Sequence, residues 1–261
     1  MPAAPNPVAV VTGGGRGIGR GIALALAADG FDLVLGWVSG RSAALETAAA
    51  VSASEGRRVV LVEGDVSDQG TAKALLDAAL SLGGLAAWVN NAGISVLAPV
   101  LDTEPADLAR MVEVNVLGTL HGLQAAGRWF VGQGGPGRIV NLASDLGVQA
   151  GVYLGAYSAT KFAVVGLTQA AALELAAAGI TVNAVCPGTA ETDMVLAERS
   201  SEVARRGLSA DTVRKRYLRD IPAGRFCTPA DVGAVVGWLC GPAAAYVTGQ
   251  AICVNGGSVL H

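Results

Sequence analysis

Tyr157 and Lys161 are the residues whose types and spacing most directly suggest chemistry. The stretch "YLGAYSATK" (153–161) holds one of only three lysines in the chain, the others being Lys73 and Lys215. On a helix, residues four apart share a face, which pairs Lys161 with Tyr157. A phenol with a pKa of about 10 is a poor acid or base at neutral pH unless a nearby cation stabilises its phenolate. The spacing therefore predicts a tyrosine that transfers a proton with a lysine beside it.

Tyr153 is a weaker candidate for the same role. Its partner four residues on is Tyr157 rather than Lys161, and Gly155 lies between Tyr153 and the predicted helix. Two interpretations of Tyr153 stay open, a wall of a substrate pocket and ordinary packing. We interpret His121, in a predicted helix over 104–131, as structural or as lying at a subunit surface.

A glycine-rich stretch near the start of the chain could hold a phosphate. In "VAVVTGGGRGIG" (8–19), Gly13, Gly17 and Gly19 follow an apolar run and precede a helical pattern. Glycine lets the backbone turn tightly and approach a pyrophosphate, which the N-terminus of the following helix favours electrostatically. The strand–turn–helix context predicts a dinucleotide-binding loop.

The elements that must position these residues alternate along the chain. Strands are predicted for the unbroken apolar runs at 8–12, 32–37, 58–63, 85–90, 138–143, 180–185 and 250–255. Helices are predicted near 18–29, 41–55, 69–82, 104–131, 155–178 and 229–240, the last with Thr228 as N-cap and Pro229 at its first position. Unbroken apolar strands alternating with helices indicate a Rossmann-type, doubly wound parallel sheet of about seven strands with helices on both faces. We expect one domain, residues 1–261.

The segment 189–227 breaks this alternation. It is long and charged, and it follows a strand at the edge of the sheet where ligands bind. We expect one or two short exposed helices and a substrate lid, with a solvated helical excursion as the alternative.

Composition excludes several function classes. The net charge of −3 and the pI near 5.4 give no footprint for nucleic acid. The four cysteines form no CxxC pair and there are two histidines, so no metal site is expected. Without a signal peptide, the expected location is the cytoplasm. The uncharged stretch 232–260 is interrupted by glycines and polar residues, so we interpret it as helix, turn and strand rather than a membrane span.

The glycine spacing T-G-x-x-x-G-x-G resembles that of the short-chain dehydrogenase/reductase superfamily. The resemblance recurs in order along nearly the whole chain, each time at the end of a predicted strand or in a helix. Its further motifs are "GDV" (64–66), "NNAG" (90–93), "NVLG" (115–118), Ser144 thirteen residues before Tyr157, "PG" (187–188) followed by Thr192, and "VNGG" (254–257).

The resemblance implies a catalytic set of Asn115, Ser144, Tyr157 and Lys161. Tyr157 would give a proton to a carbonyl oxygen while hydride arrives at carbon, or the reverse. Ser144 would hydrogen-bond that oxygen, Lys161 would also hold the ribose hydroxyls, and Asn115 would anchor a proton-relaying water. The implied cofactor contacts are Gly13, Gly15, Arg16, Gly17, Ile18, Gly19, Ser39, Asp65, Val66, Asn90, Gly93, Tyr157, Lys161, Pro187, Gly188, Ala190 and Thr192. Asp65 would contact adenine, and Asn90 would lie along the cofactor.

The end of the second strand predicts which cofactor is used. Family members that prefer NAD usually carry an acid there for the ribose 2′-hydroxyl. "LVLGWVSGRS" (33–42) has none, with Arg41 just beyond it and Arg16 in the glycine loop. We expect NADP(H) to be favoured over NAD(H).

The sequence indicates the class of reaction more specifically than it indicates the substrate. The motifs are most similar to those of 3-oxoacyl-carrier-protein reductases and related ketoreductases. Seven basic residues of the predicted lid, diluted by acids, could meet a carrier protein or a CoA phosphate: Arg199, Arg205, Arg206, Arg214, Lys215, Arg216 and Arg219. An NAD-dependent dehydrogenase of a sugar, polyol or other small secondary alcohol is the alternative.

Other interpretations of the function stay open. A non-catalytic cofactor-binding regulatory or scaffold protein is possible, although folding alone does not require the catalytic set. An epimerase or dehydratase is disfavoured by the glycine spacing, and an enoyl reductase by the spacing of Tyr157 and Lys161. The resemblance implies a homotetramer assembled through the long helices and the C-terminal strand, with no membrane or nucleic-acid partner.

Overall fold

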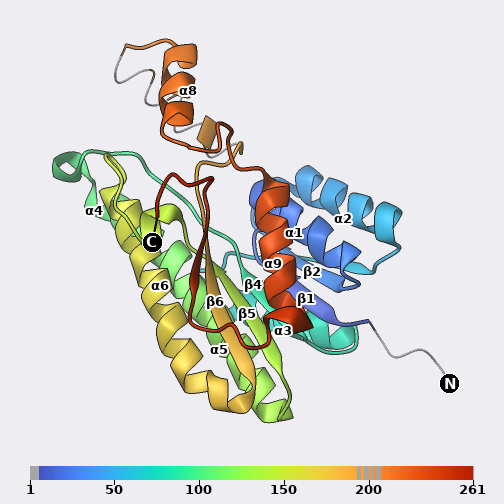
Figure 1. The fold of residues 1–261 in the computed structure, drawn as a ribbon. Coiled ribbons are helices and arrows are strands. Elements are labelled where there is room, and N and C mark those ends of the chain that lie inside the picture. Colours follow the sequence, from blue (N-terminus) through green and yellow to red (C-terminus); the bar gives the residue numbers. More distant parts are fainter. Residues whose placement is uncertain (1–5, 193–194, 197–199, 201–202, 204–206, 261) are drawn as a thin grey trace.

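A seven-stranded, all-parallel sheet forms the centre of the molecule (Figure 1). The computed structural model describes residues 6–192, 195–196, 200, 203 and 207–260. The strands are β1 (Val8–Val11), β2 (Asp32–Trp37), β3 (Val59–Glu63), β4 (Ala87–Asn90), β5 (Gly137–Leu142), β6 (Ile180–Pro187) and β7 (Ala251–Val254). Their order, β3-β2-β1-β4-β5-β6-β7, confirms the predicted doubly wound fold.

Helices cover both faces of the sheet. One hydrophobic cluster joins the strands to α1 (Gly17–Ala28), α2 (Arg41–Glu55) and α9 (Pro229–Cys240). A second cluster on the other face joins them to α3 (Gln69–Ser81), α5 (Gly118–Gln133) and α6 (Gly155–Leu175). Both faces of the central strands are therefore covered by helices, which explains why β1 and β6 are buried along their whole length.

The strand order reverses between β1 and β4, which lie side by side. In open parallel sheets, this switch point opens a crevice beyond the carboxyl ends of the strands. The loops that follow β1 and β4 carry the glycine-rich stretch and "NNAG", and the segments after β5 and β6 carry Ser144 and "PG". The fold therefore gathers the motif residues at one edge.

The helix predicted over 104–131 is present and unbroken, but part of it is π-helical. It consists of α4 (Pro105–Met111), a π-helical turn (Val112–Leu117) and α5. Asn115 is buried in this turn, and its side chain bonds the backbone of the loop after β4. A π-turn inserts one extra residue and so rotates a side chain out of the regular helical positions, which apolar periodicity does not reveal.

The C-terminal stretch 232–260 folds as the sequence predicts, into the remainder of α9, a 3₁₀ turn (Pro242–Ala244) and β7. Thr228 and Asp231 form a reciprocal capping box at the start of α9. The run Gly155–Ala178, made of α6 and a 3₁₀ turn, is long and apolar enough to cross a membrane by length and composition. Core helices of ordinary globular folds pass the same test, and α6 packs against the sheet on the cluster it shares with α3 and α5.

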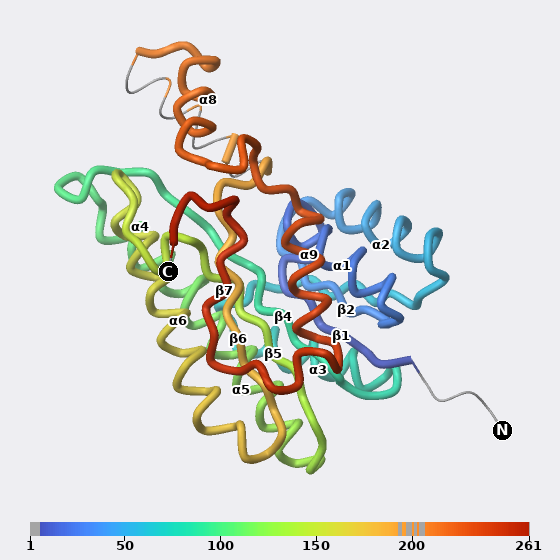
Figure 2. The backbone as a smooth tube through the Cα atoms, viewed as in Figure 1, coloured from blue at the N-terminus to red at the C-terminus, as the bar shows by residue number. Residues whose placement is uncertain are grey.

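The segment 189–227 leaves and rejoins the sheet at one point. The backbone N–H of Cys227 donates to the carbonyl of Thr189 at 3.0 Å, and that of Glu191 donates to Cys227 at 3.1 Å. Beyond this pairing, α8 (Ala210–Arg219) stands out from the body at the end of the molecule where the chain leaves β6 (Figure 2). Residues 193–194, 197–199, 201–202 and 204–206 of the predicted lid, including three of its arginines, lie outside the described residues.

Candidate active site

Tyr157 and Lys161 lie one turn apart in the first half of α6. The Nζ atom of Lys161 is 5.6 Å from the centre of the Tyr157 ring, and it donates a 2.8 Å hydrogen bond to the Leu142 carbonyl at the end of β5. Lys161 is buried, whereas Tyr157 is partly exposed. The lysine thus sits beneath the phenol, on the side toward the sheet.

Burial lowers the pKa of Lys161 to about 8, which the nearby Cys186 thiol offsets only in part. The cause is desolvation, since a buried ammonium loses its hydration and gains one carbonyl in return. A lysine with such a pKa is a charged group at neutral pH whose charge is poorly solvated. Its field therefore acts strongly on an adjacent phenolate.

Ser144 follows β5 and caps the 3₁₀ turn Asp145–Gly147 by accepting a hydrogen bond from the Leu146 N–H at 3.1 Å. Its hydroxyl donates to a carboxylate oxygen of Asp145, also at 3.1 Å. Asp145 is a neighbour that the sequence reading did not single out, although it stands next to Ser144 in the chain.

Asn115 connects three parts of the site. Its Oδ1 accepts from the Ile94 N–H at 2.8 Å, and its Nδ2 donates to the Ile94 carbonyl and to Thr160 Oγ1 at 2.9 and 3.0 Å. Both amide hydrogens are therefore committed to protein atoms, and a water held by this side chain must bind at Oδ1. The sequence did not predict a role for Thr160, because no motif distinguishes it from other threonines in helices.

Tyr153 is the only non-glycine residue with positive φ in the part of the chain that the structure describes, at 64°. Its carbonyl accepts a 2.8 Å hydrogen bond from the Ala98 N–H, and Leu154 pairs with Ala98. The strained residue joins the loop after β4 to the start of α6. The contact is made by the backbone and fixes the position of Tyr153 just before α6.

The glycine loop leaves no room for side chains at its critical positions. A Cβ at Gly19 would lie 2.1 Å from the Gly13 carbonyl, and one at Gly13, whose φ is 62°, would meet Ala92 at 3.1 Å. Gly17, with φ of 52°, would direct a Cβ toward Thr192 at 3.4 Å, which brings the turn after β6 over the loop. Arg16 is exposed at the N-cap of α1, and Ile18 packs on the core.

The backbone of Gly15 contacts α2. Its carbonyl accepts a 2.7 Å hydrogen bond from Thr47 Oγ1 in α2. Ser39 is exposed between β2 and α2, next to Gly40, whose φ of 73° lets it act as the N-cap of α2. No acid lies between the end of β2 at Trp37 and the start of α2 at Arg41.

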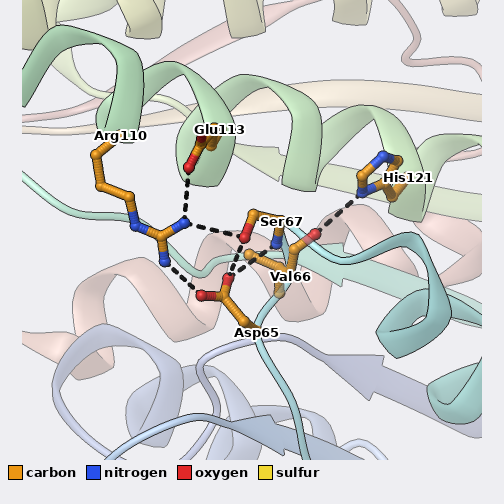
Figure 3. A network of polar contacts seen from close by, with 6 residues as sticks. All are labelled: Asp65, Val66, Ser67, Arg110, Glu113 and His121. Atoms are coloured by element: carbon orange, nitrogen blue, oxygen red, sulfur yellow. Dashed lines mark hydrogen bonds and ion pairs between the residues drawn. The ribbon is translucent and has the colours of Figure 1, made fainter. Parts of the chain in front are cut away.

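Asp65 and Val66 follow β3 and are held by side chains from α4 to α5 (Figure 3). One carboxylate oxygen of Asp65 accepts from the N–H and the hydroxyl of Ser67 at 2.9 and 2.7 Å, and the other pairs with Arg110. Burial acts to raise the pKa of Asp65, but the hydrogen bonds from Ser67 and the Arg110 pair together hold it below its usual value. Asp65 therefore remains an ionised acceptor.

His121 and Arg110 also belong to this network, and the sequence did not single out Arg110. The His121 ring lies 3.1 Å from the Val66 carbonyl, a contact within the chain that agrees with the structural interpretation of this residue (Figure 3). Arg110 also contacts Glu113 at 3.0 Å. Nothing in the sequence marks Arg110 apart from the other arginines.

Asn90, predicted to lie along the cofactor, directs its side chain into the interior of the fold. It is buried, it accepts from Trp88 Nε1 at 2.7 Å, and it donates to Asn141 Oδ1 at 2.9 Å. The next residue, Asn91, instead bonds the carbonyls of Thr12 and Gly13 and so fixes the glycine loop. The physical reason is the alternation of strand side chains, which directs Asn90 into the layer between the sheet and α5.

The remaining predicted contacts lie around the end of β6 and below the lysine. A Cβ at Gly93 would come within 3.3 Å of Asn115 Oδ1 and 3.5 Å of Lys161 Nζ. Gly188 bonds the Val254 carbonyl at 3.0 Å, directly after Pro187, and Ala190 is buried where it pairs with Cys227. Gly93 therefore brings the loop after β4 close to both Asn115 and Lys161. No cluster of potential metal ligands occurs among the described residues.

Known proteins resemble this chain along nearly its whole length. The sequence model of a family described as enoyl-(acyl carrier protein) reductase matches residues 13–259. The L-2,3-butanediol dehydrogenase of Corynebacterium glutamicum is 43% identical over 98% of this chain and 100% of its own. The diacetyl reductase ((S)-acetoin forming) of Staphylococcus epidermidis is 38% identical over the same shares.

Two further proteins match over nearly their whole lengths. A solved structure of NAD⁺-bound xylitol dehydrogenase is 31% identical with a TM-score of 0.90, covering 96% of this chain and 98% of that one. A 3-oxoacyl-carrier-protein reductase of Staphylococcus aureus is 34% identical over 97% of this chain and 98% of its own. The chain therefore belongs to the short-chain dehydrogenase/reductase superfamily and is an NAD(P)-dependent oxidoreductase that acts on secondary alcohols and ketones.

Proposed function

We propose that this enzyme interconverts a small ketone and its secondary alcohol, with Tyr157 as the general acid and base. The observation that carries the proposal is the buried Lys161 ammonium beside the Tyr157 ring, since it gives the phenol a reason to titrate within reach of neutral pH. In reduction, Tyr157 donates its proton to the carbonyl oxygen, and in oxidation its phenolate takes the proton back. Ser144 donates a hydrogen bond to the same oxygen.

A nicotinamide cofactor, when bound, supplies or accepts the hydride. The residues that fit it are Gly13, Gly17 and Gly19 at the pyrophosphate, Asp65 and Val66 at the adenine, and Gly93 and Lys161 at the ribose end. Gly188 and Thr192, after β6, border the nicotinamide end. The fit is supported by the tight turn before α1, which only glycine permits, since a Cβ at Gly19 would lie 2.1 Å from the Gly13 carbonyl.

Among the two nicotinamide cofactors, we keep NADP(H) as the proposed preference. Its support is local: no acid follows β2, and Ser39 and Arg41 stand at the N-terminus of α2, where a helix favours an anion. Arg16, exposed at the start of α1, adds charge nearby. A kcat/KM with NADH equal to or above that with NADPH would reverse the preference, and a similar protein has been solved with NAD⁺.

For the substrate, the relatives favour a small secondary alcohol over a thioester. Two relatives of 38–43% identity are named for butanediol and for diacetyl and acetoin, whereas the carrier-protein reductase is 34% identical. Three of the described basic residues of the lid segment, Arg214, Lys215 and Arg219, have partners within the chain. Arg214 stacks on Phe226 at 5.4 Å, and Lys215 pairs with Asp211 at 2.7 Å. We therefore propose a compact diol, hydroxyketone or diketone, with a 3-oxoacyl thioester as the second candidate.

Assembly and location belong to the same proposal. The outer faces of α5 and α6 expose Val131, Phe162 and Leu173, and β7 is an edge strand, so contacts between copies of the chain in a homotetramer would cover them. All four cysteines are free thiols, in keeping with the cytoplasm. The segment 189–227 would act as the lid of this single domain.

The test is a panel of diketones, hydroxyketones, diols and short 3-oxoacyl thioesters, followed by NADPH and NADH absorbance. Expected turnover is highest for a four- to six-carbon substrate with neighbouring oxygens, and Ser144→Ala lowers kcat by roughly 100-fold or more. A panel without turnover by folded, cofactor-binding protein would favour the scaffold reading. A strong preference for thioesters would favour the second candidate.

A further inference from the structure

Asp145 is a partly buried carboxyl group in direct contact with Ser144 and has no part in the mechanism above. The Ser144 hydroxyl donates to Asp145 Oδ1 at 3.1 Å, while the Leu146 N–H donates to Ser144 Oγ at 3.1 Å. A serine hydroxyl has one proton to donate. As long as Asp145 is ionised, that proton points at a carboxylate and away from any substrate oxygen.

The other carboxylate oxygen faces the C-terminal segment and the turn after β6. Ser258 Oγ donates to Asp145 Oδ2 at 3.3 Å, and a Cβ at Gly188 would lie 3.3 Å from the same atom. Asp145 therefore lies where β5, β6 and the C-terminal segment meet, beside the proposed nicotinamide end of the site.

Among the described residues, three thiols interact electrostatically with Asp145. They are Cys186 on β6, Cys253 on β7 and Cys227 before α9, and each pKa is raised, first of all by burial. No lysine or arginine forms an ion pair with Asp145 within the described ranges. Burial raises the pKa of Asp145 itself, and the hydrogen bonds from Ser144 and Ser258 only partly offset this effect.

We propose that Asp145 is a positioning residue that sets the direction in which the Ser144 hydroxyl donates. With Asp145 protonated, its carboxyl O–H donates to Ser144 Oγ, and the serine proton is free to donate to the substrate oxygen. With Asp145 ionised, the carboxylate and the substrate oxygen compete for the one serine proton. No proton passes from Asp145 to the substrate, since Tyr157 supplies the proton of each turnover and the bound cofactor supplies the hydride.

The inference rests on the proposed function, because it assigns Asp145 a role through Ser144. It predicts that kcat/KM for ketone reduction falls as pH rises through the titration of Asp145, on the acid side of the fall set by Tyr157 and Lys161. Asp145→Asn, whose amide can donate to Ser144 at every pH, should lack the first fall and keep the second. At the pH where the wild type has lost activity through the first fall, this variant should be several-fold faster.

Ser258→Ala is a milder second variant. It removes a hydrogen bond that favours the ionised carboxylate, so the first fall should move to higher pH while the second stays in place. Thermal unfolding and cofactor titration, measured beside the kinetics, separate these shifts from damage to the fold.

The deciding experiment is the pH profile of kcat/KM for a turned-over ketone in four proteins: wild type, Asp145→Asn, Ser144→Ala and the double variant. The inference requires that Asp145→Asn removes the first fall, and that it changes nothing once Ser144 is alanine. A first fall that survives Asp145→Asn, or an equal effect of this change with and without Ser144, overturns it while leaving the proposed function intact. Absence of turnover in the wild type overturns both.

Discussion

Lys161 Nζ lies 5.6 Å from the centre of the Tyr157 ring, with the Leu142 carbonyl as its hydrogen-bond acceptor at 2.8 Å. The lysine is thus placed by two elements at once, α6 and the end of β5. Burial of a charged lysine lowers the stability of the fold. Its position beside Tyr157 gives this buried lysine a role other than stabilising the fold.

Replacement of Lys161 by Met should separate stability from activity. The pKa of Lys161 in the folded state, about 8, is below its ordinary value of 10.5, so the unfolded chain binds more protons between these values. The charged lysine therefore destabilises the fold below pH 8, and this cost disappears as pH approaches 10.5. Lys161→Met should raise the free energy of unfolding at pH 7 by ~1–3 kcal/mol, and lower kcat by 10²-fold or more.

The measurement is denaturant unfolding at pH 7 and pH 10, with single-turnover kinetics. Lys73→Met, at an exposed surface ion pair, is the matched control and should change neither quantity by much. A variant less stable than wild type at pH 7 would show that the hydrogen bond to Leu142 outweighs desolvation.

Arg110→Ala should weaken cofactor binding without slowing the chemical step. Arg110 pairs with Asp65, which remains held by Ser67 alone in the variant (Figure 3). We expect the Kd of NADPH, measured by fluorescence, to rise about 5- to 30-fold, as for the loss of 1–2 kcal/mol, with kcat at saturation within about twofold. Glu113→Gln, which removes the negative charge of a second Arg110 partner and leaves the bonds of Arg110 to Asp65 and Ser67, is the control and should have a smaller effect. An unchanged Kd would mean that Asp65 does not need Arg110.

Thr160→Val should lower activity through Asn115. The variant keeps the shape of the side chain but removes the acceptor of one Asn115 amide hydrogen, at 3.0 Å in the wild type. A buried donor without a partner costs ~1–3 kcal/mol, so we expect a lower melting temperature and a kcat reduced about 10-fold or more. Thr168→Val on the same helix, which removes a partner of Asn141 rather than of Asn115, is the control. It should lose stability but keep kcat.

Thr228→Ala should cost about 1 kcal/mol of stability and leave kcat/KM unchanged. Thr228 and Asp231 cap the N-terminus of α9 reciprocally, and neither belongs to the proposed catalytic set. Urea unfolding measures the change, and Thr228→Ser, which retains the hydroxyl, should restore most of it. A loss of activity larger than the loss of stability would connect the start of α9 to the lid.

The sequence predicts the sheet, its helices and the cap of α9 because these follow from apolar runs, helical spacing and capping chemistry, all of which are local. The pairing of Tyr157 with Lys161 is local in the same sense. The π-turn at Asn115 and the core position of Asn90 escaped prediction because each depends on which face of an element meets the sheet. The roles of Arg110 and Thr160 could not be predicted because their partners are distant in the chain. That of Asp145 depends on its contacts with β6 and the C-terminal segment, which the sequence does not show.

The most direct test of the central claim is kcat for ketone reduction by Tyr157→Phe under saturating substrate and cofactor. The variant keeps the ring over Lys161 and loses only the phenolic proton, so we predict a fall of roughly 10³-fold or more with cofactor affinity unchanged. Tyr153→Phe, run in parallel, should retain kcat within about tenfold. A Tyr157→Phe enzyme with wild-type kcat would contradict the assignment of Tyr157 as the proton donor.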